Sequence, residues 1–303
     1  MRRCEVGEQA TLKLIDVRRL LPLICLLAGS VLSQGQPGAA GPDALSAAQA
    51  QALVGRVLST ELNNAQDPNH LMRYQLRKSS PRLTTTKAII ETKDGDVARL
   101  LSIDDRPLGA DDAQREQTRL DTLAGDPSLQ KHRKQSEDED AGIVLKLLRM
   151  LPNAFLYQYA GSGMDAAGKV EKFTFKPNLK FDPPDYETQA LTALSGEIWI
   201  DAAQERVTRL EGHLQQDTNY GWGILGKLNK GGWVVLEQAD VGSRQWRLVH
   251  VQMEMTMRIL FKTKEFNTNE QMTQYAPVTT GLDYRQAIQM LRPGVGSTAQ
   301  ASK

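Results

Sequence analysis

The sequence predicts an α+β protein: a strongly curved antiparallel sheet, or half-barrel, with an N-terminal helix and a helical insertion acting as a lid. Three observations predict this class. Many short segments alternate apolar and polar residues, one of them runs from Arg244 to Lys262, and a helical period appears near the N-terminus and over 111–151. A strand so much longer than the usual 5–6 residues or so is typical of a large curved sheet or partial barrel.

The first residues carry the features of an export signal. Arg18 and Arg19 precede an apolar run from Leu20 to Leu32, and Ser33 and further small residues follow. A basic region, a short apolar run and small residues at the cleavage point predict a signal peptide over residues 1–33. An apolar run of about 13 residues is too short to span a bilayer of about 30 Å as a helix.

The leader places the rest of the chain outside the cytoplasm. We expect a periplasmic or otherwise extracytoplasmic protein after cleavage, with a flexible linker over residues 34–45. Both cysteines, Cys4 and Cys25, precede the cleavage point. The mature protein then has no disulfide, and its stability must come from its core.

The N-terminal half of the mature chain predicts a helix followed by three strands. Ser46 and Gln49 form a capping-box pattern, and apolar residues at helical spacing predict a helix over 46–63 that Asn63, Asn64 and Pro68 terminate. Alternation then predicts strands near 72–77, 83–92 and 97–103. Asp94-Gly95 between the last two is a strong hairpin signal.

The helical insertion spans 111–151 and contains two expected helices. The first ends at Gly125, with Pro127 behind it, and the second passes through a charged block into an apolar stripe that Pro152 stops. Strands return after Pro152, for about nine or ten in all, near 155–159, 173–175, 196–201, 206–214, 233–239 and 244–262. A short helix over 283–291 closes a single domain of residues 46–292, and 293–303 is expected to be a disordered tail.

The long strand offers a candidate ligand-binding face. Its apolar side chains share one parity and therefore one face of the sheet. They are Val249, Val251, Met253, Met255, Met257, Ile259 and Phe261. Methionine is flexible and polarizable, which suits a cavity that adapts to variable apolar shapes. The same face would equally serve as a packed core closed by the two helical segments, and the pattern leaves both interpretations open.

Residues 221–227, Gly-Trp-Gly-Ile-Leu-Gly-Lys, imitate a phosphate-binding loop. Such a loop needs Ser or Thr after the lysine and a helix behind it, whereas Leu228 and two later glycines follow here. We therefore expect a loop between strands whose apolar tip, Trp222, Ile224 and Leu225, forms the rim of the cavity. The tip could contact a membrane surface, or fold back and plug the sheet.

The sequence assigns no catalytic residue, metal or cofactor. Its four histidines lack metal-ligand spacing, and no nucleophile motif is present. The formal net charge of +1, with both signs dispersed, argues against nucleic-acid binding, which needs a basic stripe. An exported hydrolase using Glu, Asp and His groups, such as Glu211 and His213 on one strand face, stays an alternative.

The order of elements resembles a known family. After the export leader, helix, meander and helical insertion come long strands that include Gly196-Glu197-Ile198-Trp199-Ile200-Asp201 and Arg206-Val207-Thr208-Arg209-Leu210. Over residues 46–276 this resembles the LolA/LolB superfamily of periplasmic lipoprotein carriers. The resemblance implies an unclosed half-barrel whose helices cover an apolar mouth, and it implies apolar-ligand binding.

Together these observations predict an exported protein that binds or carries a lipid or an acylated protein, without catalysis. Residues of the 249–261 face would contact the acyl chain. The rival interpretation in another class is an envelope structural or interaction protein with a fully packed core.

Overall fold

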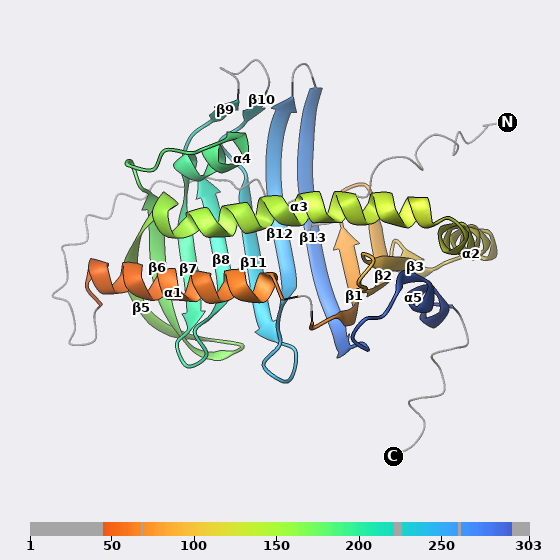
Figure 1. The fold of residues 1–303 in the computed structure, drawn as a ribbon. Helices are drawn as coiled ribbons and strands as arrows, with labels where there is room; N and C mark the ends of the chain where they lie inside the picture. The colour runs from red at the N-terminus through yellow and green to blue at the C-terminus, as the bar shows by residue number, and fades with distance from the viewer. Residues whose placement is uncertain (1–44, 68, 221–225, 260–261, 293–303) are drawn as a thin grey trace.

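The computed structural model describes residues 45–67, 69–220, 226–259 and 262–292. These residues form one open, thirteen-stranded antiparallel sheet with helices on its concave face (Figure 1). The predicted signal peptide, nearly all of the linker, the C-terminal tail, Phe261 and residues 221–225 lie outside the described ranges.

The sheet has the order β4-β3-β2-β1-β13-β12-β11-β8-β7-β6-β5, with β10 paired to β12 and β9 paired to β10. The strands that precede the helical insertion are β1 (Met72–Ser79), β2 (Thr84–Ile90), β3 (Val97–Ile103) and β4 (Arg106–Pro107). The strands that follow it are β5 (Phe155–Asp165), β6 (Gly168–Pro177), β7 (Leu194–Asp201), β8 (Arg206–Leu214), β9 (Thr218–Tyr220), β10 (Gly226–Leu228), β11 (Trp233–Asp240), β12 (Trp246–Ile259) and β13 (Lys262–Pro277).

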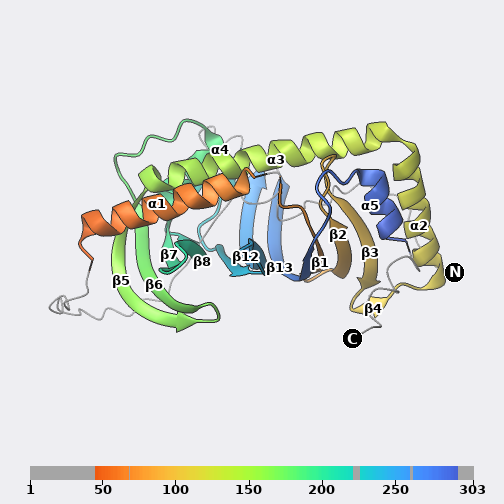
Figure 2. The same ribbon diagram turned by 60° about the horizontal axis from the view of Figure 1, so that its bottom comes forward.

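The predicted fold class is confirmed. Figure 2 shows the sheet curving beneath two long helices, α1 (Ala47–Ala65) and α3 (Pro127–Ala154). The sheet is not closed, because β4 and β5 end its order. The strand β1, which follows α1 in the chain, pairs with β13 near the C-terminus. This long-range pairing joins β1 to β4 to the strands that follow the helical insertion.

The helices occupy different parts of the sheet. α1 covers β5 to β8, whereas α3 runs across the concave face from the β3 side to β5 (Figure 1). α2 (Ala110–Gly125) and the short C-terminal α5 (Tyr284–Met290) pack beside β3 at the far edge, and the one-turn α4 (Tyr186–Gln189) lies near the C-terminal part of α3. Of the inserted helices, α3 therefore lies across the sheet, while α2 supports its edge.

Two predicted helix ends differ from the structure. α1 continues through Asn63 and Asn64 to Ala65, because the N–H of Gln66 caps it by binding the carbonyls of both asparagines. Pro152 lies inside the last turn of α3 and does not stop it. A proline removes one helical hydrogen bond, and here its own carbonyl accepts a 2.7 Å bond from Gln51 of α1.

The predicted long strand over 244–262 is present as β12, which ends three residues earlier than predicted, and the strand that follows it, β13, was not predicted. β12 ends at Ile259, which pairs directly with Lys262 of β13, so the chain reverses between them. This turn was not predictable from the sequence, because Leu260-Phe261 contains no residue typical of turns and β13 shows no regular apolar alternation. The inward face of β13 carries the buried polar residues Thr268 and Glu270, so this segment lacks the continuous apolar alternation that indicates a strand.

Candidate site: a cavity under the lid helix

A cavity of about 560 Å³ lies between the two long helices and the concave face of the sheet. That volume falls within the range of about 300–1,000 Å³ typical of small-molecule sites. Most of the residues around it are apolar. From α3 they include Val144, Leu145 and Leu148, and from the sheet Leu236, Leu248 and Met253.

The cavity exists because α3 is anchored at its two ends. Its C-terminal turns join a tight core with α1 and β5 to β8, in which Leu147, Leu151 and Phe155 are buried. Near its N-terminus, Gln130 Nε2 donates to the Asp94 carbonyl at 2.8 Å, and Glu137 accepts the Asp96 N–H at 2.9 Å. The residues of α3 that line the cavity run from Lys134 to Leu151 and include the turns between these anchors.

A second cluster forms the floor of the concave face. It is built from β1, β2 and β11 to β13, and its members include Val251, Met253 and Met255, each no more than 2 % exposed. Tyr74 and Tyr275 stack over it with ring centroids 4.9 Å apart. The cavity is therefore bounded both by this cluster and by the core under α1, since Leu58, Phe155 and Ile198 of that core also line it.

The residues predicted to line a ligand site fall into several environments. Met253 lines the cavity, while Val251 and Met255 are buried in the floor cluster beside it. Met257 packs farther along the strand against a small cluster that contains Leu214 and Leu228. Ile259 is 46 % exposed. Phe261 and the predicted rim residues Trp222, Ile224 and Leu225 lie outside the described ranges.

A bulge on β12 explains why Val249 does not line the cavity. Glu237 pairs with His250 and Gln238 pairs with Leu248, so Val249 is an extra residue without a partner on β11. A bulge changes which residues share a face. Beyond it the even-numbered Trp246 and Leu248 line the cavity, on the same side as Met253.

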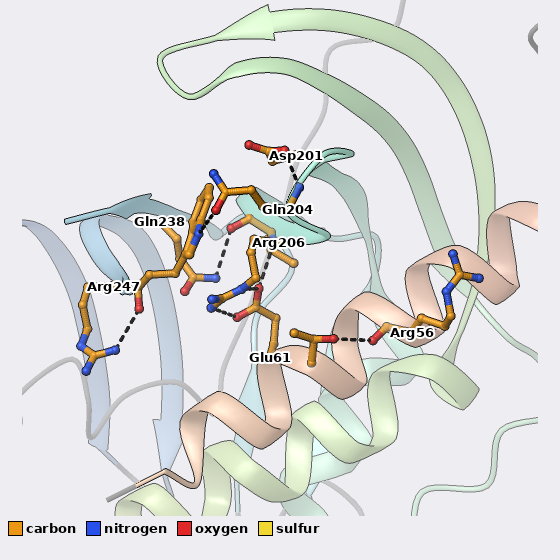
Figure 3. A network of polar contacts seen from close by, with 10 residues as sticks. Arg56, Glu61, Asp201, Gln204, Arg206, Gln238 and Arg247 are labelled. Carbon is orange, nitrogen blue, oxygen red and sulfur yellow. Dashed lines mark hydrogen bonds and ion pairs between the residues drawn. The ribbon is translucent and has the colours of Figure 1, made fainter. Parts of the chain in front are cut away.

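A buried ion pair forms one polar corner of the cavity. Arg206 of β8 donates from Nε and Nη2 to the two oxygens of Glu61 of α1, each at 2.9 Å, and both side chains are 9 % exposed. The Val207 N–H adds a third bond to Glu61 at 2.9 Å. Figure 3 shows this pair joining the helix to the sheet.

Neighbouring side chains hold the pair in place. The Arg206 guanidinium lies 5.4 Å from the ring centroid of Trp246, whose Nε1 donates to Gln204 at 3.2 Å. Gln238 donates to the Val207 carbonyl, and Arg247 donates to the Trp246 carbonyl at 3.0 Å (Figure 3). All except Gln204 line the cavity.

The charges around the cavity are unequal. Three cationic side chains line it, Lys134, Arg206 and Arg247, against seven carboxylates: Glu61, Asp67, Glu91, Asp96, Glu137, Asp138 and Glu270. Glu270 is 1 % exposed and pairs with Lys78 at 2.5 Å. Glu91 is also buried and accepts the Met72 N–H at 3.0 Å. The polar parts of the lining therefore disfavour an anionic ligand.

Sequence reasoning did not find Glu61 or Arg206. One signal was available, because Glu61 lies three residues after Leu58 and four after Val57, on the apolar stripe of α1. A carboxylate on a buried helix face requires a cation. The sequence does not identify that cation, which comes from a strand 145 residues away.

The His and Glu residues considered for hydrolysis lie on the opposite face of the sheet. Leu210 and Leu236 line the cavity, so the adjacent Glu211 and Glu237 point to the convex side. There His213 contacts Glu211 at 2.8 Å and His250 contacts Glu237 at 2.9 Å. Burial tends to raise the pKa of Glu211, but bonds from Arg209 and His213 outweigh it and lower the pKa. A carboxyl group that acts as a general acid needs a raised pKa instead.

Within the described ranges, no group of three or more His, Cys, Asp or Glu side chains is arranged to hold a metal ion. None of the described helices is both long enough and apolar enough to cross a membrane.

No protein-family model matches the chain, and neither does any curated protein. Among solved structures, it is similar to an outer membrane lipoprotein-sorting protein domain from Vibrio parahaemolyticus, with 10% identity and a TM-score of 0.33, over 79% of this chain and 96% of that one. A DUF1329 family protein from Desulfovibrio piger ATCC 29098 is similar with 9% identity and a TM-score of 0.29, over 77% and 95%. The open curved sheet and the helical cover are the two features that the resemblance implied for this fold.

Proposed function

We propose that this protein binds or carries a lipid or the acyl chain of an acylated protein in the cavity under α3, in the periplasm. The observation that carries the proposal is a cavity of about 560 Å³ with a mainly apolar lining, enclosed between α3 and the buried clusters of the sheet. Transfer of each buried methylene from water contributes about 0.8 kcal/mol, so an acyl chain would gain much by filling it.

A packed-core structural role predicts something different. In that case the concave face would be filled along its whole length, and Met253 would be closed off by α3. Instead Met253 and Leu145 both line the same cavity. We therefore favour ligand binding over a purely structural role, and no arrangement of the described side chains around the cavity suggests a catalytic step.

The experiment compares wild type with two tryptophan variants of the same helix. The protein is purified from a bacterial periplasm, analysed by native mass spectrometry for retained lipid, and titrated with an apolar fluorescent probe, 1-N-phenylnaphthylamine. Leu145→Trp places a larger side chain in the cavity and should weaken probe binding at least tenfold. Leu129→Trp is the control, because Leu129 is 42% exposed and outside the cavity lining.

Wild type that retains no lipid and takes up no probe would refute binding. Equal probe affinity in wild type and Leu145→Trp would place any binding elsewhere on the molecule.

We also propose that the end of the sheet beside residues 221–225 contacts a membrane surface. Arg258, Lys262 and Lys264 are exposed there, and Lys227 lies directly opposite Arg258 in the register of β10 and β12. Lys227 is paired with Asp217 at 2.7 Å, so Arg258, Lys262 and Lys264 are the cations that an anionic surface would attract. Co-sedimentation with vesicles containing phosphatidylglycerol should fall on Lys262→Glu substitution and with rising salt; salt-independent binding would contradict the proposal.

A further inference from the structure

Arg206 has one terminal nitrogen that its protein partners do not use. Nε and Nη2 bind Glu61, whereas Nη1 has no hydrogen-bond partner among the described residues. Nη1 is not fully enclosed by protein atoms, and Arg206 lines the cavity. A buried arginine thus presents a free donor at the edge of an apolar space.

The donor is held in a fixed orientation. Two bonds to Glu61 fix the guanidinium plane, and Trp246 lies beside it at 5.4 Å. Glu61 is itself held by the Val207 N–H. Because the planar guanidinium group of Arg206 is already ordered, a further hydrogen bond from Nη1 costs little conformational entropy.

The charge of the corner selects the type of acceptor. Glu61 neutralises Arg206, and the buried carboxylates Glu91 and Glu270 line the same cavity. The corner therefore offers no net positive charge to a carboxylate or phosphate ligand, whereas a neutral carbonyl oxygen can accept the bond without needing a countercharge.

We propose that Arg206 Nη1 donates to the carbonyl oxygen of a neutral acyl ester or amide, whose hydrocarbon chain fills the apolar part of the cavity. This inference rests on the proposed function and names the ligand class. Glu61 positions the Arg206 guanidinium, and Arg206 recognises the carbonyl oxygen of the acyl group.

The test uses three probes with the same chain and different ends: a pyrene-labelled dodecane, the corresponding dodecanoic acid methyl ester, and the free acid. Fluorescence titration of wild type at pH 7.5 should give a Kd for the ester about ten- to a hundred-fold below that of the hydrocarbon, as expected for a hydrogen bond to a charged donor. The free acid should bind no more tightly than the ester.

The key variant replaces the whole ion pair, Glu61→Leu with Arg206→Met, because removing one partner leaves a buried charge without its counterion. We expect the double variant to lose the preference for the ester while its Kd for the hydrocarbon changes by about twofold or less. Arg206→Lys, which keeps the charge without the fork, should also lose the preference. Arg247→Met is the matched control, since Arg247 lines the cavity but donates to backbone carbonyls, and it should keep the preference.

The outcomes separate the two proposals. If no probe binds wild type, the proposed function fails, and this inference fails with it. If the hydrocarbon binds as tightly as the ester, or the double variant still prefers the ester, only the role of Arg206 is overturned. Tighter binding of the free acid than of the ester would likewise overturn it, because the corner would then select an anion.

Discussion

Single residues decide how closely neighbouring strands can approach. Gly196 of β7 faces Gly212 of β8, and a Cβ built on Gly196 would lie 1.9 Å from the carbonyl oxygen of Glu211. That oxygen belongs to the backbone, so the clash cannot be relieved by turning a side chain. The sequence contains Gly196 within a strand pattern, which suggests a close backbone approach but does not say to what.

Gly196→Ala should destabilise the protein by about 3 kcal/mol or more, at the upper end of overpacking costs. Gly142→Ala is the matched control, because nothing lies within 4 Å of a Cβ at that position in α3. It should stabilise the protein by about 0.5–1 kcal/mol through helix propensity. Urea unfolding followed by circular dichroism measures both. A Gly196→Ala protein with an unchanged midpoint would disprove the close approach of β7 and β8.

At the scale of elements, the lid helix is tied to the loop that precedes β7. Lys146 of α3 binds Asp185 at 2.7 Å, and Asp185 also caps α4 by accepting the Thr188 N–H at 3.0 Å. Burial alone would raise the pKa of Asp185, but the bonds from Lys146 and Thr188 outweigh it and lower the pKa from 3.8 to about 2. The pair is partly exposed, so its contribution to stability is modest.

The sign of the pH dependence follows from that lowered pKa. A depressed carboxyl pKa contributes stability that is fully present above about pH 4 and is lost as the pH falls toward 2. Asp185→Asn keeps the shape of the side chain and removes its charge. Its melting temperature should therefore lie below that of wild type at pH 7, and the difference should shrink as the pH is lowered from 4 to 2. A difference that stays constant over this range would contradict the assignment to Asp185.

Elements with strong local signals were predictable from the sequence. The capping box of α1 and the hairpin at Asp94-Gly95 depend on residues a few positions apart, and both occur in the structure. β13 was missed because its inward face includes Thr268 and Glu270, whose burial depends on partners from distant strands. The bulge at Val249 was missed for a related reason. The register of a strand depends on its partner strand and cannot be predicted from the sequence of one strand alone.

At the scale of the whole molecule, the order of strands in the sheet could not be predicted from the sequence. The cavity depends on that order. β1 meets β13, and this contact brings the two parts of the sheet under a single helix. The alternating methionines predicted an apolar face, but whether that face is packed or hollow depends on where α3 is anchored. The face is packed in one place and hollow in another: Met255 is buried in the floor cluster, and Met253 lines the cavity.

This arrangement predicts uneven protection along α3. Its C-terminal turns are buried against α1 and β5, and its N-terminal part is bonded to the β2–β3 hairpin through Gln130 and Glu137. The central turns, around Val144 and Leu145, are only partly buried, whereas Leu147 and Leu151 line the cavity and are nevertheless buried. Local opening requires less free energy where fewer apolar contacts are lost.

Hydrogen exchange followed by mass spectrometry should therefore show faster exchange in the ligand-free protein over residues 141–146 than over 147–154. Filling the cavity with the acyl ester probe should slow exchange most in the central turns and less at Leu147 and Leu151, which line the cavity but are already buried. The exposed helix α2 provides an internal control that the probe should not affect. Uniform exchange along α3, or a probe effect confined to α2, would mean that the middle of the lid is supported by something other than the ligand.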